Sequence, residues 1–172
     1  MQVEAKSVWT NSKKEKFELD KMTIYAQKGT ATVYVDDNGE IKIKGGKDLV
    51  VKSDLFNDKA SRMLITDSEI SSIYTGCGKD IIKLHNCQFK DGFWDKSQIQ
   101  LRGSNNELYV NGDLKGEVSA QQDHLFGGKE KADRIVVNGT NYADICIDPD
   151  DKVSTKKNEG HIRNIIVVPV VC

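Results

Sequence analysis

The apolar residues of this chain come in short segments, and these segments limit the possible fold more than any other feature of the sequence. Most of them are rich in Val, Ile and Thr and are bounded by Gly, Asn or Asp. Such segments are typical of β-strands, because a helix needs an apolar pattern that extends over about 10 residues or more. The sequence predicts strands at Phe17–Leu19, Met22–Tyr25, Thr32–Val35, Glu40–Ile43, Leu49–Lys52, Met63–Thr66, Ser72–Tyr74, Ile81–Leu84, Gln98–Leu101, Glu107–Val110, Arg134–Val137, Ile145–Ile147 and Ile162–Val168.

Two further stretches have some helical character, Asp54–Met63 and Val118–Lys131. Asp54 is a suitable N-terminal cap for the first, whereas Gly127 and Gly128 interrupt the second. The clearest local prediction is a β-hairpin at Thr32–Ile43. Its strands flank Asn38-Gly39, and a type I′ turn needs positive φ at both central positions, which Asn and Gly tolerate best.

Turn-and-strand units recur in the second half of the chain. Leu108–Val110 and Ile135–Val137 are each followed by Asn-Gly and lie 27 residues apart. Gly46–Val50 and Gly78–Ile82 share the pattern Gly-Lys-Asp followed by two aliphatic residues. Units of this kind cannot bury their apolar face alone and must stack on their neighbours.

We therefore expect a mainly β fold, a short irregular β-solenoid of the parallel β-helix or β-roll kind with an antiparallel N-terminal hairpin. An antiparallel β-sandwich is the alternative, because it also has short strands at a spacing of about 8–12 residues. We expect a single domain over residues 1–172. In it, residues 1–45 form an antiparallel part that caps the turn-and-strand part at residues 46–172.

Composition excludes several classes of protein. The 172 residues are 38% hydrophobic and 30% charged, with a formal net charge of −1, so neither a wholly disordered chain nor a disulfide-dependent mini-protein is expected. The near-neutral charge predicts no nucleic-acid partner, and the longest apolar run, Ile165–Cys172, is too short for membrane insertion. The first residues lack the apolar core of a secretory signal. We expect a cytoplasmic protein, one secreted by a leaderless route, or one that has lost its leader.

One stretch, Thr75–Lys83, matches the calcium-binding nonapeptide Gly-Gly-x-Gly-x-Asp-x-apolar-x at Gly76, Gly78, Asp80 and Ile82. In this stretch the chain resembles the repeats-in-toxin (RTX) β-roll family. The resemblance implies a calcium half-site at Gly76, Gly78 and Asp80, in which turn carbonyls and the Asp carboxylate share an ion with a second turn on the same side.

A calcium ion needs about 6–8 oxygen ligands, so one such turn cannot hold it. Turns on the same side of an RTX roll lie 18 residues apart, and the matching positions here lack the motif. Those positions are Asp58, Ala60, Arg62, Trp94, Lys96 and Gln98. The interpretation that we favour makes the Asp residues before strands structural, with carboxylates that accept local backbone N–H groups and no cofactor. These residues are Asp48, Asp80, Asp133 and Asp144.

The remaining polar and aromatic clusters give little chemistry. Asp144–Asp151 contains several carboxylates but lacks EF-hand spacing, so we expect a solvated acidic turn that ends at Pro149. The three histidines are scattered, and the four cysteines form no Cys-x-x-Cys motif. We expect idle thiols, with Cys77–Cys87 and Cys146–Cys172 as the alternative disulfides.

A dense aromatic segment, Phe89–Trp94, contains Phe89, Phe93 and Trp94. We expect these side chains to be buried; if they are exposed, they can stack on a sugar ring or on a protein partner. Together, these observations predict a non-catalytic binding, scaffolding or surface-interaction module with a protein or glycan partner, or one that associates with itself. A polysaccharide-acting enzyme on a β-helix and a calcium-dependent RTX-like secreted module are the alternatives.

Overall fold

The computed structural model describes residues 3–4, 7–9, 13–54, 57–103, 105–120 and 132–164. Within these residues the protein is all β, with two mixed sheets and no helix. The expectation of a mainly β chain is therefore confirmed. No helix in the described part is long and apolar enough to cross a membrane.

The first sheet, sheet A, has eight strands. They are β1 (Val3–Glu4), β5 (Thr32–Val35), β6 (Ile41–Lys44), β8 (Ser61–Thr66), β10 (Asp80–His85), β13 (Glu107–Asn111), β15 (Arg134–Asn141) and β17 (Lys152–Asn158), and this is also their order in the sheet.

The second sheet, sheet B, has ten strands. They are β2 (Ser7–Trp9), β3 (Lys14–Leu19), β4 (Met22–Gln27), β7 (Leu49–Ser53), β9 (Glu69–Tyr74), β11 (Gln88–Phe89), β12 (Gln98–Gln100), β14 (Glu117–Ala120), β16 (Asp144–Ile147) and β18 (His161–Asn164). The short strand β11 pairs with β9 beside β12.

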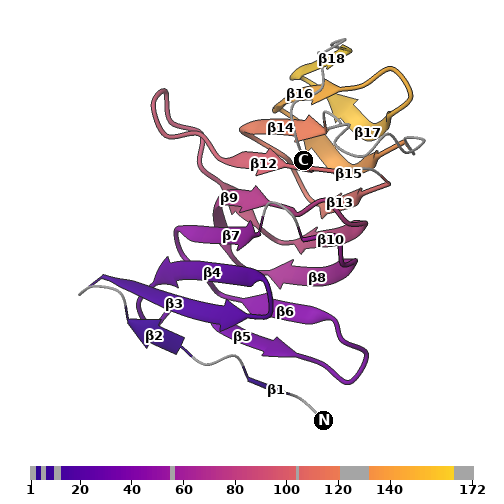
Figure 1. The fold of residues 1–172 in the computed structure, drawn as a ribbon. Helices are drawn as coiled ribbons and strands as arrows, with labels where there is room; N and C mark the ends of the chain where they lie inside the picture. Colours follow the sequence, from indigo (N-terminus) through magenta and orange to yellow (C-terminus); the bar gives the residue numbers. More distant parts are fainter. Residues whose placement is uncertain are drawn as a thin grey trace.

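From β8 onward each new strand lies parallel to an earlier strand of its own sheet, and the chain alternates between the two sheets except that β11 and β12 both belong to sheet B (Figure 1). One sheet A strand and the following sheet B strand are called a rung below. The two segments that lie 27 residues apart pair directly, with Leu108 opposite Ile135 and Val110 opposite Val137. The antiparallel pairs all involve β1–β7.

The hairpin is confirmed, but its predicted turn is wrong. β5 and β6 pair antiparallel around a three-residue loop closed by the Asp36 N–H, which donates to the Glu40 carbonyl at 3.0 Å. Gly39 has a φ of 77° while Asn38 does not have positive φ, so this is not a type I′ turn. The Asp36 carboxylate accepts the N–H groups of Asn38 and Glu40 at 2.9 Å each and holds the loop.

Neither helical expectation holds in the described residues. The Asp54–Met63 stretch leads into β8 at Ser61, and residues 55–56 lie outside the described part. The Val118–Lys131 stretch begins within β14, and residues 121–131 lie outside the described part. β14 pairs in parallel with β12 and β16, and this pairing stabilises a strand there although the sequence has a weak helical pattern.

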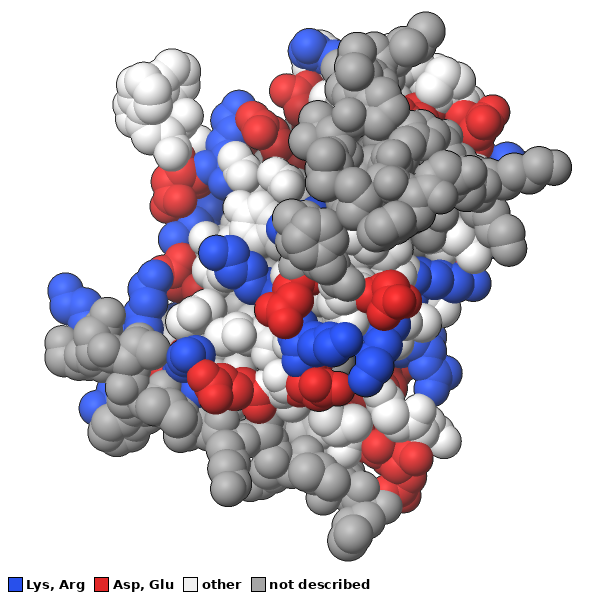
Figure 2. Space-filling view, viewed as in Figure 1, with Lys and Arg blue, Asp and Glu red and all other residues white. Residues whose placement is uncertain are grey.

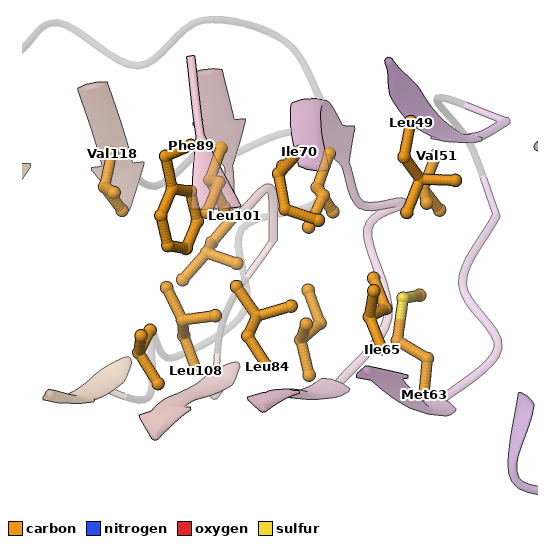
Figure 3. Packing of buried hydrophobic residues seen from close by; sticks show 14 of the residues in the cluster. Leu49, Val51, Met63, Ile65, Ile70, Leu84, Phe89, Leu101, Leu108 and Val118 are labelled. Atoms are coloured by element: carbon orange, nitrogen blue, oxygen red, sulfur yellow. The ribbon is translucent and has the colours of Figure 1, made fainter. Parts of the chain in front are cut away.

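The core lies between the two sheets, where alternate side chains of the central strands point inward. Figure 3 shows Leu49, Val51 and Ile70 of sheet B opposite Met63, Ile65, Leu84 and Leu108 of sheet A. These side chains are almost completely buried, and each contributes about 1.5–3 kcal/mol of stability by its burial. The outward-facing positions of both sheets remain available for function.

Candidate functional sites

Buried polar side chains form a ladder at the starts of the sheet A strands β8, β10, β13, β15 and β17. Asp80 Oδ1 accepts the Ser61 N–H at 3.1 Å, and Asn106 Oδ1 accepts the Asp80 N–H at 2.8 Å. Asp133 Oδ1 then accepts the Asn106 N–H at 2.7 Å, and Asp151 Oδ1 accepts the Asp133 N–H at 2.8 Å. Each side chain thus accepts a backbone N–H of the preceding rung. The Ser61 N–H also donates to the Lys79 carbonyl at 3.2 Å.

Burial changes the acidity of this ladder. It raises the pKa of Asp80 to about 6, against the opposing effect of hydrogen bonds from Ser61. Burial raises the pKa of Asp133 to about 8, and the negative charges of Asp151 and Asp148 add to the increase while the hydrogen bond from Asn106 opposes it. Within the described part, Asp133 Oδ2 is buried without a hydrogen-bond partner, which is consistent with a protonated carboxyl.

The acidic turn at residues 148–151 is not fully solvated, contrary to expectation. Asp151 is buried, and its Oδ2 accepts the Asp148 N–H at 2.9 Å. Burial raises the pKa of Asp151 as well. Pro149 and Asp150 are exposed, as a solvated turn requires, but Asp151 belongs to the buried ladder.

The turn between β9 and β10 contains the residues of the RTX resemblance. A Cβ on Gly76 would lie 2.5 Å from the Asn57 carbonyl oxygen, and one on Gly78 would lie 2.5 Å from the Lys59 carbonyl oxygen. Both glycines therefore allow this turn to pack against the preceding one. The N–H groups of Cys77 and Gly78 donate to the Asn57 oxygen at 2.7 and 3.1 Å.

Asp80 accepts backbone N–H groups as we predicted: one comes from Ser61 of the preceding rung, and the Gly76 backbone of its own turn also stabilises the carboxylate. No group of three or more His, Cys, Asp and Glu side chains among the described residues could hold a metal ion. Calcium at Gly76, Gly78 and Asp80 remains a prediction.

The aromatic segment has one buried and two exposed members. Phe89 lies in the core, as expected, but Phe93 is 83% exposed and Trp94 is 93% exposed. Their rings meet edge to face with centroids 4.8 Å apart. They lie at the tip of the loop Lys90–Lys96, called the aromatic loop below, which projects from the body of the molecule between β11 and β12 (Figure 1).

The aromatic loop is held at its tip and at its base. A bridge pairs Asp91 with Lys96, and the Gly92 N–H donates to the Asp95 carbonyl at 3.2 Å. The Lys90 ammonium lies 2.5 Å from an Asp48 carboxylate oxygen and 3.3 Å from one of Asp95. The pKa of Asp48 is lowered, and the largest cause is its hydrogen bond with the Lys90 ammonium. The tip is therefore presented by an ordered loop.

The outer face of sheet A carries a groove of about 690 Å³ across β8, β10, β13 and β15, called the sheet A groove below. Three columns of outward-facing side chains line it, because these parallel strands are in register. The central column is Leu64, Lys83, Tyr109 and Val136; one flank contains Arg62 and Ile81, and the other contains His85, Asn111 and Asn138. Asn111 Nδ2 lies 2.7 Å from His85 Nδ1 and Asn138 Nδ2 donates to Asn111 Oδ1 at 3.1 Å, so the polar flank is itself a ladder.

The outer face of sheet B has a smaller hollow of about 300 Å³. Glu117 of β14 and Asp144 of β16 are neighbours across the two paired strands in this hollow. Asp144 is also 3.8 Å from the Arg163 guanidinium. Asp144 thus faces outward and does not belong to the buried ladder.

The histidines and cysteines form no common centre among the described residues. His85 lies on sheet A and His161 on β18, while His124 lies outside the described part. Cys87 and Cys146 are free, so both alternative disulfides are wrong. Burial raises the pKa of the Cys87 thiol. Cys77 is disulfide-bonded, which corrects the expectation of four idle thiols.

No protein-family model, curated protein or solved structure matches this chain. The function is therefore argued from the geometry of the molecule.

Sequence reasoning identified Asp80, Asp133 and the aromatic segment but missed the sheet A groove. The sequence feature that marks the groove is the presence of apolar residues at outward-facing strand positions, where they alternate with buried ones. These residues are Leu64, Ile81, Tyr109 and Val136. The groove becomes visible only once the register of the strands is known.

Proposed function

We propose that this chain is a two-sheet parallel β-solenoid that serves as a non-catalytic surface-interaction module. The solenoid interpretation is supported by the alternation between sheets, the parallel register and the ladder that connects successive rungs. The aromatic loop is its recognition element, and it inserts into an apolar site on a protein partner.

The exposure of Phe93 and Trp94 carries this proposal. Large aromatic side chains that are exposed to water gain nothing from apolar burial. In an interface each of them buries about 150–250 Å² of surface, which stabilises the complex. Trp is enriched among the residues that dominate binding energy, and such residues act as anchors surrounded by polar groups. In Figure 2 the tip of the loop is a projecting group of uncharged atoms with acidic side chains beside it.

The order of the loop supports the same role. The contacts of Lys90 with Asp48 and Asp95 restrain its base before any partner arrives. A recognition loop that is already ordered loses less conformational entropy on binding. Over the face in Figure 2, basic and acidic side chains are interspersed, which favours a local apolar contact over a partner of a single charge.

The two alternatives have less support. For a polysaccharide-acting enzyme, the neighbouring carboxylates Glu117 and Asp144 are the best candidates, but the strongly raised carboxyl pKa values belong to Asp80 and Asp133 inside the molecule. For an RTX-like calcium module, Asp80 is the only carboxylate of its turn motif.

Photo-cross-linking tests the proposed function. Benzoylphenylalanine replaces Phe93, and in a control chain it replaces Lys52, which is exposed on β7 of sheet B, away from the sheet A strands. Irradiation in the cells that make the protein is expected to give a discrete protein adduct from position 93 only, and Trp94→Ser is expected to abolish it. The partner identified by mass spectrometry must then bind the purified wild-type chain and lose affinity for Trp94→Ser. Equal adducts from both positions, or none from position 93, would overturn the proposal.

A further inference from the structure

The sheet A groove has the chemistry of a receptor for an aromatic tip. Its outward-facing side chains Leu64, Ile81, Tyr109 and Val136 are only half-buried, although they lie on the solvent side of the sheet. The corresponding columns of sheet B carry mainly polar residues, among them Gln98, Gln100, Glu117 and Ser119. An apolar groove on one outer face of a two-sheet molecule indicates that this face is covered by another group.

Charge narrows the choice of that group. Lys83 is exposed in the central column between Leu64 and Tyr109. Of the two acidic residues that line the groove, Glu40 lies 3.0 Å from the Lys42 ammonium and Glu107 lies opposite Arg134. The groove therefore favours an aromatic group with a negative charge beside it.

The aromatic loop of the same protein has this composition. Asp91 and Asp95 flank Phe93 and Trp94. Their carboxylates lie 4.0 Å from the Lys115 ammonium and 3.3 Å from the Lys90 ammonium, respectively, and their side chains remain 58% and 71% exposed. The loop leaves the molecule at the β11–β12 connection of sheet B and projects away from the outer face of sheet A (Figure 1). Tip and groove of one chain are thus directed apart, and they can meet only between copies.

We propose that the Phe93–Trp94 tip of one copy inserts into the sheet A groove of a second copy. This inference rests on the proposed function and names its partner. The two surfaces differ, so the contact is heterologous, and copies can join in a row, a ring or a reciprocal dimer. Two aromatic anchors bury far less than the about 1,200–2,000 Å² of a stable interface, so the association is weak and depends on concentration.

Sedimentation of the full chain from micromolar to millimolar concentration tests the inference. The mass-average molecular weight of the wild type is expected to rise with concentration. A tip variant, Phe93→Ser with Trp94→Ser, and a groove variant, Val136→Glu, are both expected to remain monomeric. Gln100→Glu is the matched control, because it adds the same charge to the outer face of sheet B and should associate like the wild type.

Mixing the two variants gives the decisive result. The tip variant keeps its groove and the groove variant keeps its tip, so an equimolar mixture is expected to form a one-to-one complex that neither forms alone. Lys83→Glu provides a second groove variant at an exposed position, where a folding defect is not expected, and it should also reduce association of the wild-type chain.

A wild type that stays monomeric up to millimolar concentration, or a mixture without a complex, would overturn the inference. The proposed function can survive that result. A cross-link from position 93 to a different protein supports the interaction module but contradicts self-association, whereas a cross-link to a second copy supports both.

Discussion

Asp133 shows how a single buried carboxyl makes the stability of the whole chain depend on pH. A carboxyl whose pKa is higher in the folded chain than in the unfolded one holds its proton more tightly when folded. Its contribution to stability is complete below the ordinary value of 3.8 and is lost as the pH rises through about 6 for Asp80 and about 8 for Asp133. Asp36 and Asp48 have lowered pKa values, and their contributions are lost at acidic pH. The chain should therefore be most stable between about pH 4 and 6.

We predict that the melting temperature falls by several degrees between about pH 5 and about pH 9, and that Asp133→Asn makes this dependence shallower. Asn keeps the Oδ1 acceptor for the Asn106 N–H and removes the charge, and Asn106 itself occupies the equivalent position one rung earlier. One kcal/mol corresponds to about 2–4 °C for a chain of this size. Thermal denaturation followed by circular dichroism measures the effect, with exposed Asp58→Asn as the control. An unchanged slope in Asp133→Asn would show that this carboxyl is ionised at neutral pH.

The turn between β9 and β10 has a structural explanation that makes no use of calcium. Its glycines allow close contact with the carbonyls of Asn57 and Lys59, and Asp80 already accepts hydrogen bonds from Ser61. We predict that melting curves with millimolar calcium and with a chelator superimpose. A ligand that binds only the folded chain must raise the melting temperature, so an increase with calcium that disappears in Asp80→Asn would instead support the RTX-like site.

Most strands could be predicted from the sequence, because their apolar residues alternate with polar ones and are bounded by turn residues. β17 was missed since six of its seven residues are polar, and it exists through parallel pairing with β15. The Gly46–Val50 and Gly78–Ile82 segments look alike but lead into β7 of sheet B and β10 of sheet A. Sequence similarity alone could not separate the two sides of the molecule.

The exposure of the aromatic loop could not be predicted because it depends on rung length. Ser72 of β9 pairs with Gln98 of β12, whereas Gln98 pairs with Glu117 in the next rung. The segment between Ser72 and Gln98 is longer than the segment between Gln98 and Glu117, and its additional residues form the Lys90–Lys96 loop. Phe89 lies before this point and stays in the core, while Phe93 and Trp94 lie beyond it.

At the scale of the whole molecule, each rung contacts mainly the rungs before and after it. Stability in such a stack is approximately a sum of local terms, so it need not be uniform along the chain. Central side chains such as Ile82, Ile99 and Leu108 are almost completely buried. At the C-terminal end of the described part, β18 consists of exposed residues, and Ile162 is 38% exposed although it continues the core column of Ile145.

We predict that hydrogen exchange measured by mass spectrometry is slowest in β8–β13 and becomes faster toward β17 and β18. Leu108→Ala should cost about 2–5 kcal/mol and accelerate exchange in β10, β13 and β15, because it leaves a cavity between tightly packed rungs. Ile162→Ala, the matched variant in the last described strand, should cost much less and affect mainly β16 and β18. A sandwich with one cooperative core would instead lose protection everywhere at once in both variants, since all of its strands would open in the same transition. A solenoid is distinguished from a sandwich if the loss of hydrogen-exchange protection is confined to the strands next to the substituted residue.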